Sequence, residues 1–149
     1  MSLTPPPRHK YRNTAQQAMV SLLYAAAHLE RLVAEACEAH GVTHEQYNVL
    51  RILRGAQPDG LPRYEIASRM VYRAPDVTRL LDRLEARSLV KRMRSDEDRR
   101  VSLTIISRAG LGLLERMESD IVAVHERVAE SLTAAERREL ARLCDLLVR

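Results

Sequence analysis

Apolar side chains recur at intervals of three and four residues along most of the chain, the spacing that places them on one face of an α-helix. This pattern predicts a long helix over about 14–39 and a second over about 108–130. Gly41 suits the end of the first helix, because glycine adopts the left-handed conformation of a helix stop. Ser107 is placed to cap the second.

Two capping boxes mark further helix starts. In each, a threonine is followed three residues later by a side chain that can bond back to it: Thr43 with Gln46, and Thr133 with Glu136. The first box opens a helix that the glycines of 55–60 interrupt. The second opens the last helix, which the apolar spacing carries to about residue 148.

The middle of the chain changes from helical to alternating patterns. Pro62 and Pro75 are placed as the first residues of two helices, the second of which runs to about Arg87. A short strand then covers 89–93, and apolar residues at every second position predict another over 101–105. A charged tip joins them, so the pair forms a hairpin.

A short helix, a turn, a second helix and a charged hairpin form a winged helix-turn-helix. We therefore predict a mainly α fold with a small β-hairpin wing. Residues 1–149 form one domain, in which 1–12 are a flexible arm and 43–106 are the winged lobe. The long helices of 13–42 and 107–149 are suited to dimerisation. A helix-turn-helix protein that binds DNA as a dimer gains affinity and specificity, because it contacts two half-sites of the DNA.

Composition narrows the classes of protein. Apolar residues make up 46% of the 149 residues and charged residues 30%, an ordinary globular balance. With five Tyr and no Phe or Trp, an aromatic cofactor pocket or base-stacking surface is hard to build, and we predict no cofactor. The longest nearly apolar run, 18–27, is shorter than the ~20 residues of a membrane-spanning helix. Two cysteines and no export signal favour the cytoplasm.

Positive charge is concentrated in one segment. Between residues 61 and 100 there are eleven basic side chains, ten of them arginine, and seven acidic ones, so this segment carries the whole net charge of +4. Such a footprint is typical of a nucleic-acid-binding face, although a solvated helix face with salt bridges gives similar counts.

The segment also resembles a known family. Residues 77–90, VTRLLDRLEARSLV, resemble the recognition helix and first wing strand of MarR-type regulators. The sequences DEDRR at 96–100 and ISRAG at 106–110 resemble the wing motif and the start of the following helix, with Ile-Ser in place of the family's Leu-Thr. The resemblance covers about 14–148. It implies an obligate homodimer on palindromic operators, frequent repression, and release by a small phenolic or lipophilic ligand, a metal or an oxidant.

We predict that double-stranded DNA is contacted by the start of the helix near 75–87 and by the wing near 91–105. The helix would enter the major groove, and Arg100, oriented by the carboxylate of Asp98, would reach the minor groove. Asp76 is more suited to capping the helix than to touching DNA. The predicted DNA-binding residues are Arg73, Ala74, Pro75, Thr78, Arg79, Arg83, Arg94, Asp98, Arg99 and Arg100.

Other candidate sites are weaker. Cys37, His40 and His44 have a spacing that zinc can use, but the helix stop between them removes any common face, so no metal site is predicted. Cys144 follows the apolar stripe of the last helix and is expected to be a small core residue.

Four side chains are candidates for an effector pocket between the long helices and the winged lobe: Tyr24, His28, Tyr47 and Tyr72. Tyr47 also lies on a core stripe, which favours a structural role.

No acid–base pair, nucleophile–base pair or phosphate-binding glycine loop is present in the sequence, so we do not predict an enzyme. The sequence predicts a dimeric, sequence-specific transcriptional regulator, and the family resemblance implies a repressor that a small molecule can release. Two alternatives remain: an all-α protein-interaction module with a basic face, and a metal-responsive regulator.

Overall fold

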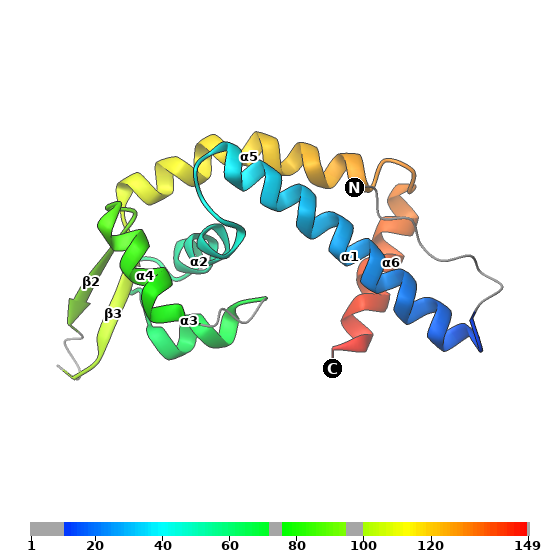
Figure 1. Ribbon diagram of the computed structural model, residues 1–149, viewed down its shortest axis with the longest axis horizontal. Helices are drawn as coiled ribbons and strands as arrows, with labels where there is room; N and C mark the ends of the chain where they lie inside the picture. Colours follow the sequence, from blue (N-terminus) through cyan, green and yellow to red (C-terminus); the bar gives the residue numbers. More distant parts are fainter. Residues whose placement is uncertain (1–10, 72–75, 95–99, 149) are drawn as a thin grey trace. The chain divides into compact units, whose positions relative to one another are not determined.

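The computed structural model describes residues 11–71, 76–94 and 100–148 (Figure 1). Its elements are α1 (Thr14–Ala39), α2 (His44–Gly55), β1 (Leu61–Pro62), α3 (Arg63–Arg69), α4 (Val77–Ala86), β2 (Val90–Arg94), β3 (Ser102–Ile106), α5 (Arg108–Val128) and α6 (Ala134–Leu147). The chain divides into two compact units. We call Ala34–Ser119 the central unit, and Met1–Val33 with Asp120–Arg149 the terminal unit.

Both capping boxes form as predicted. The Thr43 hydroxyl accepts a hydrogen bond from the Gln46 N–H at 3.3 Å, and the Gln46 side chain accepts one from the Thr43 N–H at 3.0 Å. Thr133 and Glu136 repeat this arrangement at the start of α6. Gly41 has a φ of +72°, so the chain leaves α1 through the left-handed conformation that glycine adopts without strain.

Pro62 does not begin a helix. It lies in β1 with an extended ψ of 154°, and Leu61 and Pro62 pair with β3. The wing is therefore part of a three-stranded antiparallel sheet in the order β1-β3-β2. Proline is tolerated in β1 because this is an edge strand, where a missing N–H breaks no ladder.

Helix α4 begins later than the sequence predicted. Its first residue is Val77, because the preceding Asp76 has a non-helical φ of −144° and caps the helix with its side chain. Pro75, the predicted first residue, lies outside the described residues.

The buried face of β3 differs from the one that apolar alternation selects. Thr104 and Ile106 are buried, whereas Leu103 and Ile105 are only half-buried. β3 is the central strand of the sheet, and α2 and α3 also contact it. Since neither face is fully solvated, alternation alone does not decide which one is the core.

The central unit has the better-filled core. Its fully buried side chains come from α1 to α5 and from β2, and include Cys37, Leu50, Leu53, Ile66, Leu81, Leu84, Val90 and Met117. In the terminal unit, Leu32 and Val33 of α1 and Ile121 and Val124 of α5 are buried. No helix in the described ranges is both long and apolar enough to span a membrane.

Candidate nucleic-acid interface

Helix α4 presents two different faces. Leu80, Leu81 and Leu84 are buried against the central unit, at the spacing of one helix face. The other face is exposed and carries Thr78, Arg79, Asp82 and Arg83. Two of the predicted DNA-binding arginines are thus on the solvent side, four residues apart and one turn from each other.

The start of α4 is shaped by a single carboxylate. Asp76 Oδ1 accepts a hydrogen bond from the Arg79 N–H at 3.0 Å, which confirms the predicted cap. Its other oxygen, Oδ2, lies 3.2 Å from Arg79 Nε. Asp76 therefore holds both the backbone and the side chain of Arg79.

Two hydrogen bonds fix the elements around α4. Asn48 of α2 accepts one from the Val71 N–H at 3.3 Å, just beyond α3. Arg87, directly after α4, donates one to the Gly41 carbonyl at 2.7 Å. These two bonds join the segments after α3 and after α4 to residues at least 23 positions earlier in the chain, in α2 and just before it.

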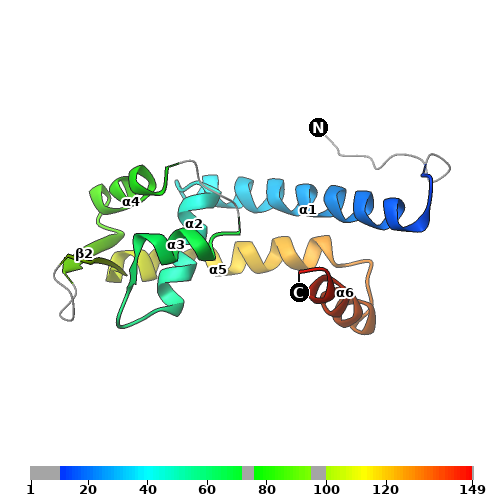
Figure 2. The same ribbon diagram turned by 90° about the horizontal axis from the view of Figure 1, so that it is seen from below.

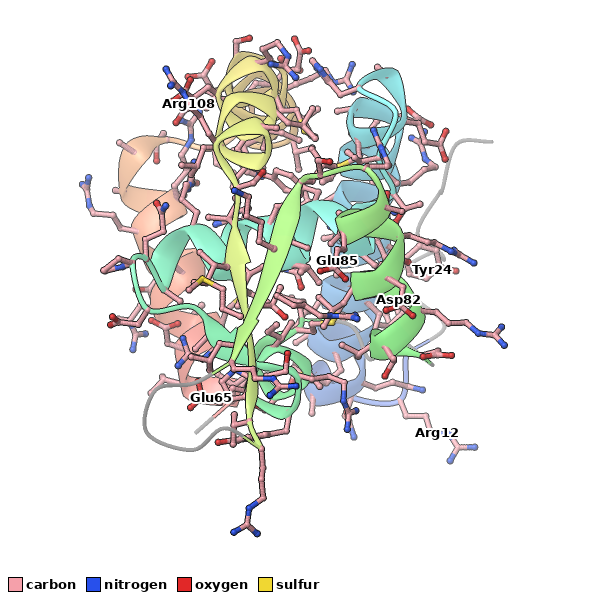
Figure 3. The ribbon with its side chains drawn as sticks, turned by 90° about the vertical axis from the view of Figure 1, so that its left-hand side faces the viewer. Arg12, Tyr24, Glu65, Asp82, Glu85 and Arg108 are labelled. Carbon is pink, nitrogen blue, oxygen red and sulfur yellow. The ribbon has the colours of Figure 1, made fainter. Side chains whose placement is uncertain are left out.

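The wing is tied to α4 by Arg92 of β2. Its guanidinium lies 2.5 Å from Asp82 Oδ1 and 3.4 Å from Glu85 Oε2. Both carboxylates point from α4 toward the strands (Figure 3). Sequence reasoning missed this pair of ion pairs. The available signal was the spacing of Asp82 and Glu85, which places two acids on one side of a helix followed by an arginine-rich strand.

A compact joint closes the base of the wing. The Ser107 hydroxyl donates to the Ser88 carbonyl at 2.6 Å and accepts from the Gly110 N–H at 3.0 Å. Ser107 thus caps α5, as predicted, and also holds the turn after α4. Figure 2 shows how α4 leads through this turn directly into β2.

The structure places five predicted DNA-binding residues on the surface of the central unit. They are Thr78, Arg79, Arg83, Arg94 and Arg100. Five others, Arg73, Ala74, Pro75, Asp98 and Arg99, lie outside the described residues, so the predicted orientation of Arg100 by Asp98 remains a prediction.

Comparison with known proteins decides the family. The MarR family model matches residues 42–102. A crystal structure of a MarR transcription factor from Planctomyces limnophilus is 37% identical, with a TM-score of 0.69, and the match covers 92% of this chain and 99% of that one. The chain belongs to the MarR family.

Two further proteins are similar to this chain. The homoprotocatechuate degradative operon repressor of Escherichia coli is 26% identical over 106 residues, which are 71% of this chain and 70% of the repressor. A mutant E. coli MarR complexed with operator DNA shares the fold, at 22% identity and a TM-score of 0.78, over 91% of this chain and 95% of that one. This MarR-family protein is a DNA-binding regulator of transcription.

The candidate effector residues fall on different parts of the chain. Tyr47 is buried in the central unit, and the guanidinium carbon of Arg51 lies 5.8 Å from the centre of its ring. Burial raises the pKa of the Tyr47 hydroxyl. This confirms that Tyr47 lies on a core-facing stripe, as the spacing predicted. Tyr24 and His28 are half-buried in the terminal unit, and Tyr72 lies outside the described residues.

The terminal unit of this MarR-family protein contains a hollow of about 390 Å³. It is lined by His28, Arg31, Leu32, Arg127, Val128 and Glu130. His28 Nδ1 and Arg31 Nη2 are 3.5 Å apart within it. Among the predicted effector residues that the structure describes, His28 alone lines this hollow.

The two cysteines differ in environment. Cys37 is fully buried, and desolvation together with nearby Glu45 and Glu38 raises the pKa of its thiol to about 11. Within the described ranges, no three His, Cys, Asp or Glu side chains converge as metal ligands, and Cys37, His40 and His44 are not brought together in such a group. Cys144 is half-buried, which corrects its expected core position, because no residue of α6 is buried in the single chain.

Proposed function

We propose that the protein is a homodimeric repressor that binds a palindromic operator through α4 and the wing. The observation that carries this proposal is that the cationic side chains of these elements are exposed: Arg79 and Arg83 on α4, Arg94 at the end of β2, and Arg100 before β3. B-DNA's major groove admits one α-helix, and the exposed face of α4 carries Arg79 and Arg83.

Each side chain has a role in this arrangement. Thr78 and Arg79, in the first turn of α4, contact base edges, and Arg83 and Arg94 contact phosphates. Arg100 reaches the minor groove. The proposal also includes Arg73, Ala74, Pro75 and Arg99 as DNA-binding residues, and Asp98 as the group that orients Arg100.

The apolar surface of α6 supports the homodimer. Leu140, Leu143 and Leu147 lie on one side of this helix and are 45–53% exposed. Met19 and Leu23 of α1 are also exposed. A second copy of the same chain would cover such a face through a self-complementary, two-fold interface.

The hollow of the terminal unit supports a small-molecule effector. Its leucine and valine side chains suit the apolar part of a phenolic or lipophilic ligand, and its arginines suit an acidic group on that ligand. We expect such a ligand to raise the melting temperature and weaken operator binding, and we expect Arg127→Gln to reduce both effects.

The test of DNA binding is a fluorescence anisotropy titration with the duplex that flanks the gene, at two salt concentrations and with scrambled competitor. The double variant Arg79→Ala/Arg100→Ala should bind about 100-fold more weakly, since each well-placed arginine contributes roughly 1–3 kcal/mol. The variant Arg116→Ala/Arg138→Ala removes the same charge from α5 and α6 and should bind like wild type. Wild-type affinity in the first variant would overturn the proposal.

The same titration separates the alternatives. A protein-interaction module with a basic face would bind operator and scrambled duplex equally well. A metal-responsive regulator would change its affinity when zinc or a chelator is added, and the described residues offer no ligand group that favours this outcome.

A further inference from the structure

The geometry at the start of α4 bears on which base Arg79 reads. Asp76 Oδ2 lies 3.2 Å from Nε of Arg79, while Asp76 Oδ1 accepts the backbone N–H of the same residue. One carboxylate thus defines both where the helix begins and how the guanidinium at its third position is held.

The ion pair uses one edge of the guanidinium. Arginine carries five N–H donors, four of them on the two terminal nitrogens, and an ion-pair contact at Nε leaves these four to other acceptors. Those two nitrogens form the planar fork that matches O6 and N7 of guanine in the major groove. The side chain of Arg79 is 78% exposed, so this fork is accessible to a DNA partner.

The pair contributes little to folding. The side chains of Arg79 and Asp76 are 78% and 48% exposed, and ion pairs in such positions add little to stability. An acid at a DNA-binding surface also repels phosphates unless its charge is compensated. An orienting role accounts for both features. It gives the ion pair a function other than stability, and the paired arginine compensates the charge of the acid.

We propose that Asp76 is a positioning residue that orients Arg79 toward a guanine, and that each operator half-site contains this guanine. The inference rests on the proposed entry of α4 into the major groove. It assigns Asp76 a part in base specificity beyond its role as a helix cap.

The variant Asp76→Asn separates the orienting role of Asp76 from its role as a helix cap. Asparagine caps helices as well as aspartate does, so the start of α4 is kept, whereas the carboxylate that pairs with the guanidinium is removed. Glu65→Gln is the matched control. It removes one negative charge from an exposed ion pair, with Arg69 of α3, in the same unit.

The experiment selects bound duplexes from a pool with a randomised central region, using wild type, Asp76→Asn, Arg79→Ala and Glu65→Gln. Duplexes in which single base pairs of the wild-type motif are changed are then titrated. Arg79→Ala identifies the guanine that Arg79 reads. For wild type, replacing this guanine by adenine should weaken binding roughly 5- to 150-fold, the range of a bidentate arginine–guanine pair.

In Asp76→Asn the preference for the same guanine should fall to about three-fold or less, while Glu65→Gln keeps the wild-type preference. An unchanged guanine preference in Asp76→Asn overturns the inference and leaves the proposed function intact. So does a loss of preference at a different base pair, which would mean that Asp76 reads a base itself. If wild type enriches no sequence at all, the proposed function fails, and the inference fails with it.

Discussion

Gly110 lies so close to the Leu89 carbonyl that an added Cβ would overlap its oxygen. This close approach belongs to the joint at the base of the wing, where Ser107 also bonds to the Ser88 carbonyl and to the Gly110 N–H. The Ser-x-x-Gly sequence at the start of α5 therefore has a physical basis. Its hydroxyl joins two segments, and its glycine lets the helix approach a backbone carbonyl.

Gly110→Ala should destabilise the protein by about 1–3 kcal/mol, the usual cost of overpacking against backbone that cannot move aside. Gly112→Ala, two residues on in the same helix, should instead stabilise it by about 0.5–1 kcal/mol. There the added Cβ meets only the end of the Arg116 side chain, at 3.6 Å. Urea denaturation measures both, and equal effects of the two substitutions would contradict the steric interpretation.

Cys37 illustrates how burial decides thiol chemistry. Because its pKa is raised from 9.0 to about 11, the thiolate population at pH 8 is about a hundred-fold lower than for an ordinary cysteine. We expect iodoacetamide to label Cys37 at least about 100-fold more slowly in the native protein than in urea, as followed by mass spectrometry. Rapid native labelling of Cys37 would contradict both its burial and the direction of its pKa.

At the scale of elements, the relation between α4 and the wing depends on Arg92. This side chain joins a strand to two acids of the helix, and the three side chains are 33–52% exposed. Ion pairs of this exposure contribute at most about 1 kcal/mol each to stability. We expect their larger effect to be geometric, since both elements that we propose to bind DNA must reach their grooves together.

Arg92→Gln should weaken operator binding by up to about ten-fold, the equivalent of one to two such ion pairs, while the dependence of affinity on salt is unchanged. Arg94→Gln, on the same strand, should lower the salt slope by about 0.9 for each phosphate that the protein no longer neutralises. Arg92→Lys should recover part of the affinity, because an ammonium can still pair with one carboxylate. A reduced salt slope in Arg92→Gln would show instead that Arg92 touches DNA directly.

At the scale of the whole molecule, the single chain leaves the apolar side of α6 exposed. α6 begins at a capping box, and the Arg137 guanidinium closes the preceding turn on the carbonyls of Ala129 and Leu132, so the helix is well anchored. Yet it buries no residue. An anchored helix with an exposed leucine stripe is typical of an oligomer interface.

Leu143→Glu should convert the proposed dimer to a monomer at micromolar concentration in sedimentation velocity, because it places charges at a desolvated interface. Operator affinity should fall by about 100-fold or more, since a monomer engages only one half-site. Arg138→Glu, on the opposite side of α6, should leave a dimer. A dimeric Leu143→Glu protein would show that this stripe is not the interface.

Much of this protein was determined by the sequence alone. The bounds of α1, the two capping boxes, the cap on α5 and the placing of arginines on the exposed face of α4 all follow from residues within one or two turns of each other. Helix starts and helix faces are local properties, because their hydrogen bonds and side-chain spacing involve neighbouring residues.

Only the tertiary structure decided the rest. β1 has two residues, too few to show a period, and it exists because Leu61 pairs with Thr104, far along the chain. The Thr104 face of β3, the pairing of Arg92 with Asp82 and Glu85, and the close approach of Gly110 to Leu89 depend on how distant segments pack. Such interactions leave no periodic signal in the sequence, because each joins residues that are far apart along the chain and come into contact only when the chain is folded and packed.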